Sequence, residues 1–316
     1  MVIATPATLR RERIHVVVTC TNLKTRPVPA HLRLRDVTGT RLAPRLNAWI
    51  RRLSDEATPA IPARELYAGQ HWDVARRLPS TAPDLDIVMW ICSAGYGLIP
   101  SDARIRPYSA TFANTHADRV SSSRTGWTAW WAALQEWNGP TDGPRSLVQL
   151  AAGHSADRLL VVLSQPYLVA CRADVLAAAA QLRQSSLLSV ISAGTKADPE
   201  LADLLLPADA RLQQVVGGTR QSLNVRVAGL LLSRRHYEHD SMRTHLVEVL
   251  ATQPAVRRYD RQPLSDSQVR AFIRQGLGAD PAVGHTRLLR ALRTAGFACE
   301  QARFATLFQA ETRAAP

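Results

Sequence analysis

The chain has 316 residues, of which 46% are hydrophobic and 21% are charged, and both fractions are ordinary for a globular protein. Thirty-nine lysines and arginines against 26 acidic residues give a formal net charge of +13. An excess of this size predicts an anionic partner, with nucleic acid favoured over an acidic membrane surface. No apolar run approaches the roughly 18 residues that a membrane span needs, so the sequence predicts no membrane partner.

The cysteine pattern predicts buried thiols in a reducing cytoplasm. No two cysteines have CxxC spacing, so we expect neither a zinc ribbon nor an iron–sulfur cluster, and the sequence predicts no metal and no cofactor. Residues 1–13 are expected to form an N-terminal arm, because their apolar stretch is too short for a signal peptide. The cysteines are Cys20, Cys92, Cys171 and Cys299.

Apolar runs and helical spacing alternate along most of the chain. β-branched or apolar runs without helical period predict short buried strands. These runs cover residues 15–19, 85–92, 159–163 and 187–191, and a fifth, shorter strand is expected over 211–216. Helices are expected over residues 45–53, 63–78, 125–137, 170–183 and 223–234. This order predicts an α/β fold, a three-layer sandwich with a mostly parallel central sheet.

Four polar loops follow the predicted strands. Right-handed crossovers bring the carboxyl ends of parallel strands to one edge, where open α/β sheets bind ligands. The loops at residues 20–24, 93–99, 164–167 and 192–196 are therefore expected to form one site. The alternative is a set of solvated loops. The chain has only two lysines, Lys24 and Lys196, and otherwise uses arginine. Lys24, directly after the first strand, therefore predicts a compact positive charge for a phosphate or a developing anion.

Most of the tryptophans of residues 125–137 are expected to be core anchors rather than a platform for stacking bases. His236 and His239 have a spacing that a metal uses on a helix. No third ligand accompanies them, so we expect a surface pair.

After residue 236 the strand pattern ends, and residues 237–316 are expected to form a helical domain with helices over 241–252, 265–277, 284–295 and 299–310. One of these helices carries Arg287, Arg290 and Arg293 opposite a leucine face, and Arg303 lies on the next helix. Two helices, a glycine turn and an arginine face fit a helix-turn-helix-like contact with nucleic acid. The alternative is a solvated helical cap.

Residues 14–115 resemble the YaaA-like family of small bacterial and phage proteins, and the remaining sheet resembles it loosely. The resemblance rests on a cysteine and a lysine after the first strand, on ARELYAGQHW at 63–72 and on ICSAGYGLIPSDARIRPY at 91–108, followed by SATF. The hallmark of that family is a Ser-Ala-x-Tyr-Gly-Leu loop, here residues 93–98, followed by a Pro-Tyr, here Pro107 and Tyr108, and by a threonine, here Thr111. The usual cysteine-glycine-lysine start is replaced by residues 20–24, Cys-Thr-Asn-Leu-Lys.

Such proteins look like relatives of the uracil-DNA glycosylase fold and of domains that handle deazaguanine bases in tRNA. A long, basic version with a C-terminal helical domain is similar to anti-phage DNA glycosylases that remove modified bases. The resemblance therefore implies excision of a bulky modified pyrimidine, such as a glucosylated hydroxymethylcytosine, from phage DNA.

The resemblance also implies residue roles, because a base must be flipped out of the duplex to be excised. Asn22 positions the water or contacts the sugar, and Asp102 is the nearest carboxylate for a general base. The residues expected to bind the base are Cys20, Thr21, Ser93, Gly95, Tyr96, Gly97 and Tyr108. Those expected to contact phosphate or sugar are Lys24, Ser164, Gln165 and Lys196. DNA is expected to bind Arg287, Arg290, Arg293 and Arg303.

Two other functions remain open from the sequence. One is a non-catalytic nucleic-acid-binding stress protein, which the basic charge supports equally well. The other is an enzyme of deazaguanine or nucleotide metabolism that acts on tRNA or nucleosides. All three are expected to operate in the cytoplasm.

Overall fold

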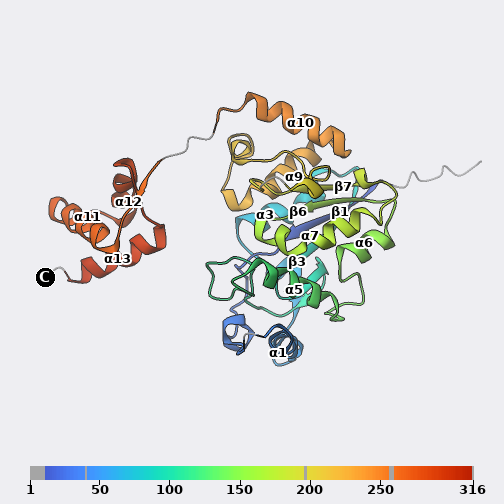
Figure 1. The fold of residues 1–316 in the computed structure, drawn as a ribbon, viewed down its shortest axis with the longest axis horizontal. Helices are drawn as coiled ribbons and strands as arrows, with labels where there is room; N and C mark the ends of the chain where they lie inside the picture. Colours follow the sequence, from blue (N-terminus) through green and yellow to red (C-terminus); the bar gives the residue numbers. More distant parts are fainter. Residues whose placement is uncertain (1–10, 40, 196–197, 256–259, 315–316) are drawn as a thin grey trace, which may run out of the picture. The chain divides into compact units, whose positions relative to one another are not determined.

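The computed structural model describes residues 11–39, 41–195, 198–255 and 260–314. The chain divides into two compact units, Met1–Pro254 and Ala255–Pro316 (Figure 1). Within the described residues, no helix is both long and apolar enough to cross a membrane.

The first unit is built on a five-stranded sheet with the order β4-β3-β1-β6-β7. Four strands are parallel, and β4 pairs antiparallel with β3 at one edge. The parallel strands are buried on both faces, which explains their nearly continuous apolar sequences. The α/β class and the mostly parallel sheet predicted from the sequence are confirmed. The strands are β1 (Arg13–Thr19), β3 (Asp86–Ser93), β4 (Gly97–Pro100), β6 (Arg158–Val162) and β7 (Leu188–Ile191).

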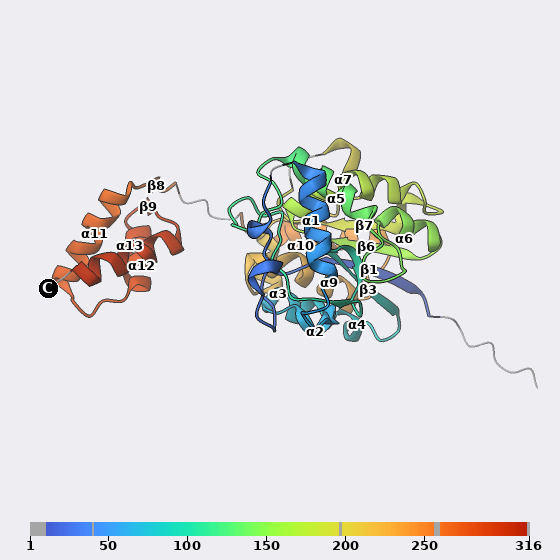
Figure 2. The same ribbon diagram turned by 90° about the horizontal axis from the view of Figure 1, so that it is seen from below.

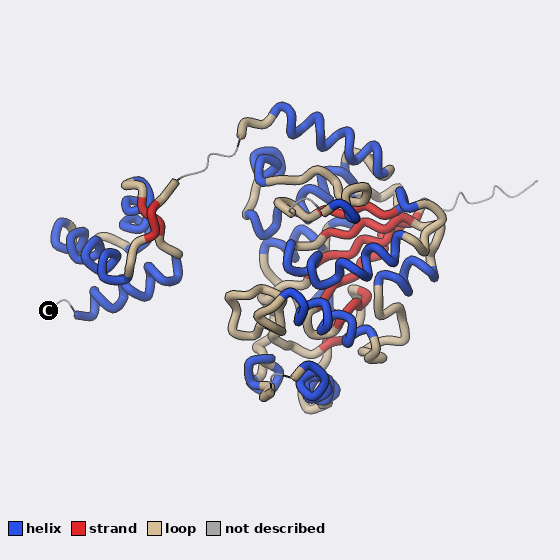
Figure 3. Tube along the Cα trace, viewed as in Figure 1, coloured by secondary structure: helices blue, strands red, loops and turns tan. Residues whose placement is uncertain are grey.

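Helices lie on both sides of this sheet (Figure 3). On one side α9 (Leu223–Ser233) packs against β6 and β7, and on the other α7 (Gln165–Ala179) packs with α5 (Arg124–Gln135) and α6 (Leu147–Gly153). Trp127, Trp130 and Trp131 of α5 are buried, as expected for core anchors. The remaining helices are α1 (Leu42–Ser54), α2 (Ala63–Leu66), α3 (Gln70–Ala75), α4 (Leu78–Thr81), α8 (Gln213–Val216) and α10 (His239–Thr252). A small antiparallel pair joins β2 (Ile61–Pro62) to β5 (Arg104–Ile105). Figure 2 shows the ribbon turned by 90° from the view of Figure 1.

Two predicted elements differ in the structure. Residues 211–216 are not a strand: a 3-10 turn over Ala210–Leu212 leads directly into α8. The Asp209 side chain caps that turn by accepting from the Arg211 N–H at 2.8 Å. The single helix expected over residues 63–78 is broken between α2 and α3, because Gly69 has a φ of +92° that a continuing helix does not permit.

The loop expected at residues 93–99 is a tight hairpin between β3 and β4. Ser93 pairs with Gly97 and Trp90 pairs with Pro100, so the chain reverses at once and runs back along β3. Gly97 has a φ of +74°, which favours glycine at this turn. The fifth strand of the sheet is therefore this antiparallel edge strand.

The second unit begins later than the expected position 237. The first unit extends to Pro254, because α10 buries Met242, Leu246 and Leu250 in the core of the α/β unit. Apolar side chains that include Ile273, Leu292 and Phe304 form the separate core of the second unit. Its elements are β8 (Gln262–Pro263), α11 (Asp266–Ala279), α12 (His285–Thr294), β9 (Phe297–Ala298) and α13 (Gln301–Ala314).

Candidate functional site

A pocket opens at the carboxyl end of β1. The chain passes from β1 to β3 on one side and later returns to β6 on the other, so this is the topological switch point at which α/β sheets bind ligands. The pocket has a volume of about 340 Å³. Its walls are residues 19–23, residues 68–71, Thr111 and Ala113, then Val162, Ser164 and Tyr167, and finally Thr219, Gln221 and Asn224.

The loop after β1 forms one wall of the pocket and is held by its backbone. The Cys20 N–H donates to the Cys92 carbonyl at 3.0 Å, and the Thr21 hydroxyl donates to the Leu23 carbonyl at 3.0 Å. The Ala68 N–H also donates to the Leu23 carbonyl, at 3.1 Å. Asn22 is exposed, and its side-chain amide makes no hydrogen bond to any residue that the structure describes. It is therefore available to a ligand.

Lys24 turns inward, away from the pocket. Its Nζ donates to the carbonyls of Thr21 and Asn22, at 2.5 and 3.3 Å. The same atom lies 5.0 Å from the ring centre of Tyr67 and 4.6 Å from that of Tyr108. Burial lowers the pKa of Lys24 to about 8. The expected direct contact with phosphate is thus not formed, because the ammonium is occupied in holding two carbonyls of the loop.

Tyrosine hydroxyls form a buried polar layer below the loop. The Tyr108 hydroxyl lies 2.9 Å from the Tyr67 hydroxyl and 2.6 Å from Ser93 Oγ. Cys20 Sγ lies 3.1 Å from the Tyr167 hydroxyl. Burial raises the pKa of all three tyrosines, so the hydroxyls are neutral. Ser93 and Tyr108 were expected to bind the flipped nucleobase. They lie in this buried layer and do not line the pocket.

Tyr96, Gly95 and Gly97 are likewise absent from the pocket wall. Tyr96 is 2% exposed, and its hydroxyl accepts from the Arg106 N–H at 3.0 Å. The Gly95 carbonyl accepts from the indole N–H of Trp49 at 3.0 Å. The hairpin packs these residues into the core, so the expected stacking of Tyr96 on a base is not possible in this conformation.

Asp102 also lies away from the pocket. It follows β4, which runs back along β3 as far as Pro100 opposite Trp90. Trp90 lies three residues before Ser93, at which β3 ends, and three residues of strand span about 10 Å. The chain therefore reaches Pro100 about 10 Å from the carboxyl edge of the sheet, and Asp102 follows beyond that point. The role of general base expected for Asp102 is therefore not supported. None of the residues that line the pocket is a carboxylate.

His71, which the sequence reasoning missed as a site residue, lines the pocket. Its Nε2 donates to the Thr19 carbonyl at 3.0 Å, and it also contacts the Gln221 backbone. Burial lowers its pKa, which favours the neutral ring. His71 lies in the segment 63–72 that carried the family resemblance. The place of His71 within this segment was the one sequence feature that could have marked it as a site residue.

Two other bonds align the strand ends at the pocket. The Ser164 N–H donates to Thr19 Oγ1 at 3.0 Å, so Ser164 lies at the wall as expected. Asn224, also missed, accepts from the Ala193 N–H and donates to the Leu163 carbonyl, both at 2.8 Å. Gln165 donates to the Gly194 carbonyl and does not line the pocket. Lys196 lies outside the described residues.

A second cluster lies at the opposite, amino edge of the sheet. His15 Nε2 and His154 Nδ1 lie 3.2 and 3.3 Å from Asp157 Oδ2, a spacing that a metal ion fits. However, the Trp90 indole, which only donates, bonds to His15 Nδ1 at 3.0 Å. The proton of neutral His15 must then lie on Nε2, whereas a metal-bound Nε2 requires it on Nδ1. The cluster is therefore a hydrogen-bonded group.

His236 and His239 do not form the expected surface pair. His236 Nδ1 lies 2.8 Å from Ser241 Oγ. His239 is buried, with Nδ1 3.0 Å from Ser189 Oγ of β7, because α10 packs on the first unit.

In the second unit, the four arginines expected to bind DNA are not equivalent. Arg290 and Arg293 line one hollow, whereas Arg287 faces Asp280 at 3.6 Å and Arg303 is bound to Asp266 at 2.6 Å. The leucine face of α12, opposite its arginines, is buried, as the helical spacing predicts.

No protein-family model matches this chain, and no curated protein is significantly similar to it. What the fold and the pocket define is a class: an α/β protein with a pocket at a topological switch point, lined by no carboxylate, lysine or arginine.

Proposed function

We propose that the protein is a DNA glycosylase on a uracil-DNA glycosylase-like fold with a C-terminal nucleic-acid-binding unit. It excises a modified pyrimidine, such as glucosylated hydroxymethylcytosine, from phage DNA and leaves an abasic site, as a cytoplasmic defence. The observation that carries the proposal is the switch-point pocket, whose walls offer hydrogen-bonding groups and no carboxylate. A flipped base is an uncharged ligand that is recognised through the hydrogen bonds of its edge.

The walls of the pocket suit such a ligand. Hydroxyl and amide side chains are among the residues that line it, and these are Thr21, Asn22, Ser164 and Asn224. A volume of about 340 Å³ lies within the range of small-ligand sites and leaves room for a base that carries a substituent.

The rim carries an apolar side chain. Leu23 is 65% exposed, although its carbonyl is fixed by the Ala68 N–H. Proteins that distort DNA insert such side chains between base steps. Leu23 is therefore assigned to the space that the extruded nucleotide leaves in the duplex.

The reaction replaces the bond between the sugar C1′ and the base nitrogen by a bond to water oxygen. Positive charge develops on the sugar and negative charge on the leaving base. Asn22, whose amide is exposed, positions the water but cannot accept its proton. The proton that the water loses passes through solvent to the leaving base anion, which departs as the neutral base. The positive charge of Lys24 lies on the inner side of the loop and favours the anionic base. Modification of the base that stabilises its anion reduces the catalytic demand further.

The test is to incubate the purified protein with glucosylated phage DNA and with matched unmodified DNA, and to count abasic sites with an aldehyde-reactive probe. Abasic sites in modified DNA alone are the expected result. DNA binding without abasic sites would indicate the non-catalytic nucleic-acid-binding protein. Base release from free nucleosides or tRNA, and not from DNA, would indicate the enzyme of nucleotide or deazaguanine metabolism. Either of the latter results overturns the proposal.

A further inference from the structure

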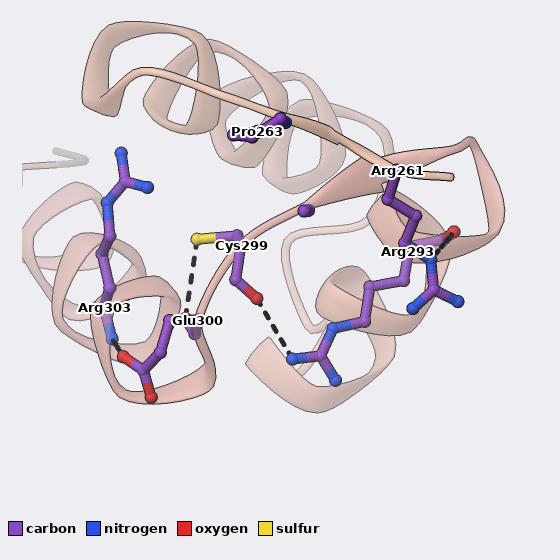
Figure 4. A pocket seen from close by; sticks show the side chains of 7 residues that line it. Arg261, Pro263, Arg293, Cys299, Glu300 and Arg303 are labelled. Carbon is purple, nitrogen blue, oxygen red and sulfur yellow. Dashed lines mark hydrogen bonds between the residues drawn. The ribbon is translucent and has the colours of Figure 1, made fainter. Parts of the chain in front are cut away.

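The second unit carries two adjoining hollows that share Arg261 and Arg293. The first, which we call the cysteine hollow, has a volume of about 400 Å³ and is also lined by Cys299, Glu300 and Arg303. Figure 4 shows it with Arg261 and Arg293 on one side and Arg303 on the other. The second, the arginine hollow, has a volume of about 320 Å³ and is also lined by Arg290, Thr286, Thr294 and Gln301.

The charge in the cysteine hollow is largely balanced. The Glu300 carboxylate accepts from the N–H groups of Ala302 and Arg303, at 3.0 and 2.8 Å, at the start of α13. The Arg303 guanidinium bonds to Asp266 at 2.7 Å and to the Leu264 carbonyl at 2.9 Å. An added anion would therefore meet a carboxylate and an arginine that already has a counter-charge.

No acidic residue lines the arginine hollow. Its lining consists of three arginines, two threonines, a glutamine and Leu289. Arg290 is exposed, and its side chain makes no hydrogen bond or ion pair with any residue among those that the structure describes. Hydroxyl and amide donors beside a guanidinium such as that of Arg290 are what a phosphate group binds.

The backbone fixes the shared arginines at the edge of this hollow. Arg261 Nε donates to the Arg293 carbonyl at 3.0 Å, near the C-terminal end of α12, and Arg293 Nη2 donates to the Cys299 carbonyl at 3.1 Å (Figure 4). A guanidinium has five N–H groups, so this single bond orients Arg293 and leaves donors for a ligand. The hollow is thus pre-organised by α12 and by the residues that flank β8 and β9.

We propose that the arginine hollow binds a phosphate of the DNA backbone, with Arg290 and Arg293 as its principal ligands. This contact holds DNA of any sequence, because phosphates carry no direct sequence information. It differs from a recognition helix that reads bases with all of its arginines, since Arg287 on the same helix faces Asp280. The inference rests on the nucleic-acid-binding role proposed for the second unit. It does not depend on base excision, because it concerns unmodified DNA.

The test uses the full chain and fluorescence anisotropy with a labelled, unmodified DNA duplex over a series of salt concentrations. Loss of one phosphate contact makes the plot of log K against log salt shallower by about 1 and weakens binding about tenfold near 0.1 M salt. We expect this result for Arg290→Gln. We expect a similar loss for Arg293→Gln and a smaller one for Arg293→Lys, which keeps the charge but not the fork of donors.

Arg287→Gln is the matched control, because it removes the same charge from the same helix outside both hollows. It should change the affinity less than twofold. Equal weakening by Arg287→Gln and Arg290→Gln would mean that only net charge matters, and this overturns the proposal. Unchanged binding by Arg290→Gln, or no DNA binding by the wild type, overturns it as well. Arg290 is exposed, so an unaltered thermal midpoint is expected and confirms that the variant is folded.

Discussion

Lys24 should make the stability of the first unit depend on pH in a way that Lys24→Met abolishes. The pKa of Lys24 in the folded protein is about 8, against an ordinary value of 10.5, because burial beneath the loop disfavours the ammonium. A shift of this size corresponds to at most about 3 kcal/mol of differential stability, at 1.36 kcal/mol for each pKa unit.

The direction of the pH dependence follows from whether the folded or the unfolded chain holds the Lys24 proton. Below pH 8 the lysine is protonated in both the folded and the unfolded chain, and its contribution is a constant penalty. Between pH 8 and 10.5 only the unfolded chain holds the proton, so unfolding takes up a proton and the free energy of unfolding rises with pH. The difference between wild type and Lys24→Met in this free energy should therefore grow in favour of the wild type over that interval.

Urea unfolding at pH 7, 8, 9 and 10 measures this difference. The chain has only two lysines, Lys24 and Lys196, so Lys196→Met is the natural control. In protein with ¹³C-labelled lysine, Lys196→Met also assigns the two NMR signals, and the Lys24 signal should titrate with a midpoint of about 8. A Lys24 signal that titrates at the ordinary value, or stability curves for wild type and Lys24→Met that stay parallel, would refute the reasoning.

Four further substitutions test the site. Asn22→Ala should abolish base release and leave DNA affinity unchanged; normal release in the abasic-site assay would remove Asn22 from the mechanism. Asp102→Asn should change the rate of release less than twofold, whereas loss of a general base would cost about 10²–10⁴-fold in the same assay. Leu23→Ala should slow release from duplex DNA more than from single strands, which have no stack to fill; equal slowing would contradict the wedge. Tyr108→Phe should lower the free energy of unfolding by about 1–3 kcal/mol in urea titrations, because Ser93 and Tyr67 lose a buried partner. An unchanged midpoint would show that this layer contributes little.

The sequence determined the elements whose burial is visible locally. The strands β1, β3, β6 and β7 have continuous apolar runs because both faces of a parallel sheet are covered. Their alternation with helices fixed the class of fold, and the rule for parallel strands located the pocket at the end of β1. Cys20, Thr21, Asn22 and Ser164 were found in this way, because they immediately follow strands.

Only the tertiary structure decided which polar groups reach the pocket. The hairpin at Ser93 depends on pairing between β3 and β4, which no local pattern specifies, and it removed Tyr96 and Asp102 from the site. Lys24 turned inward because carbonyls of its own loop and two tyrosines from distant segments surround its ammonium. His71 reached the wall because Gly69 broke a helix that the spacing predicted. The burial of a strand can be predicted from a run of consecutive apolar residues. The direction of a side chain depends on contacts with residues far along the chain, which no local pattern shows.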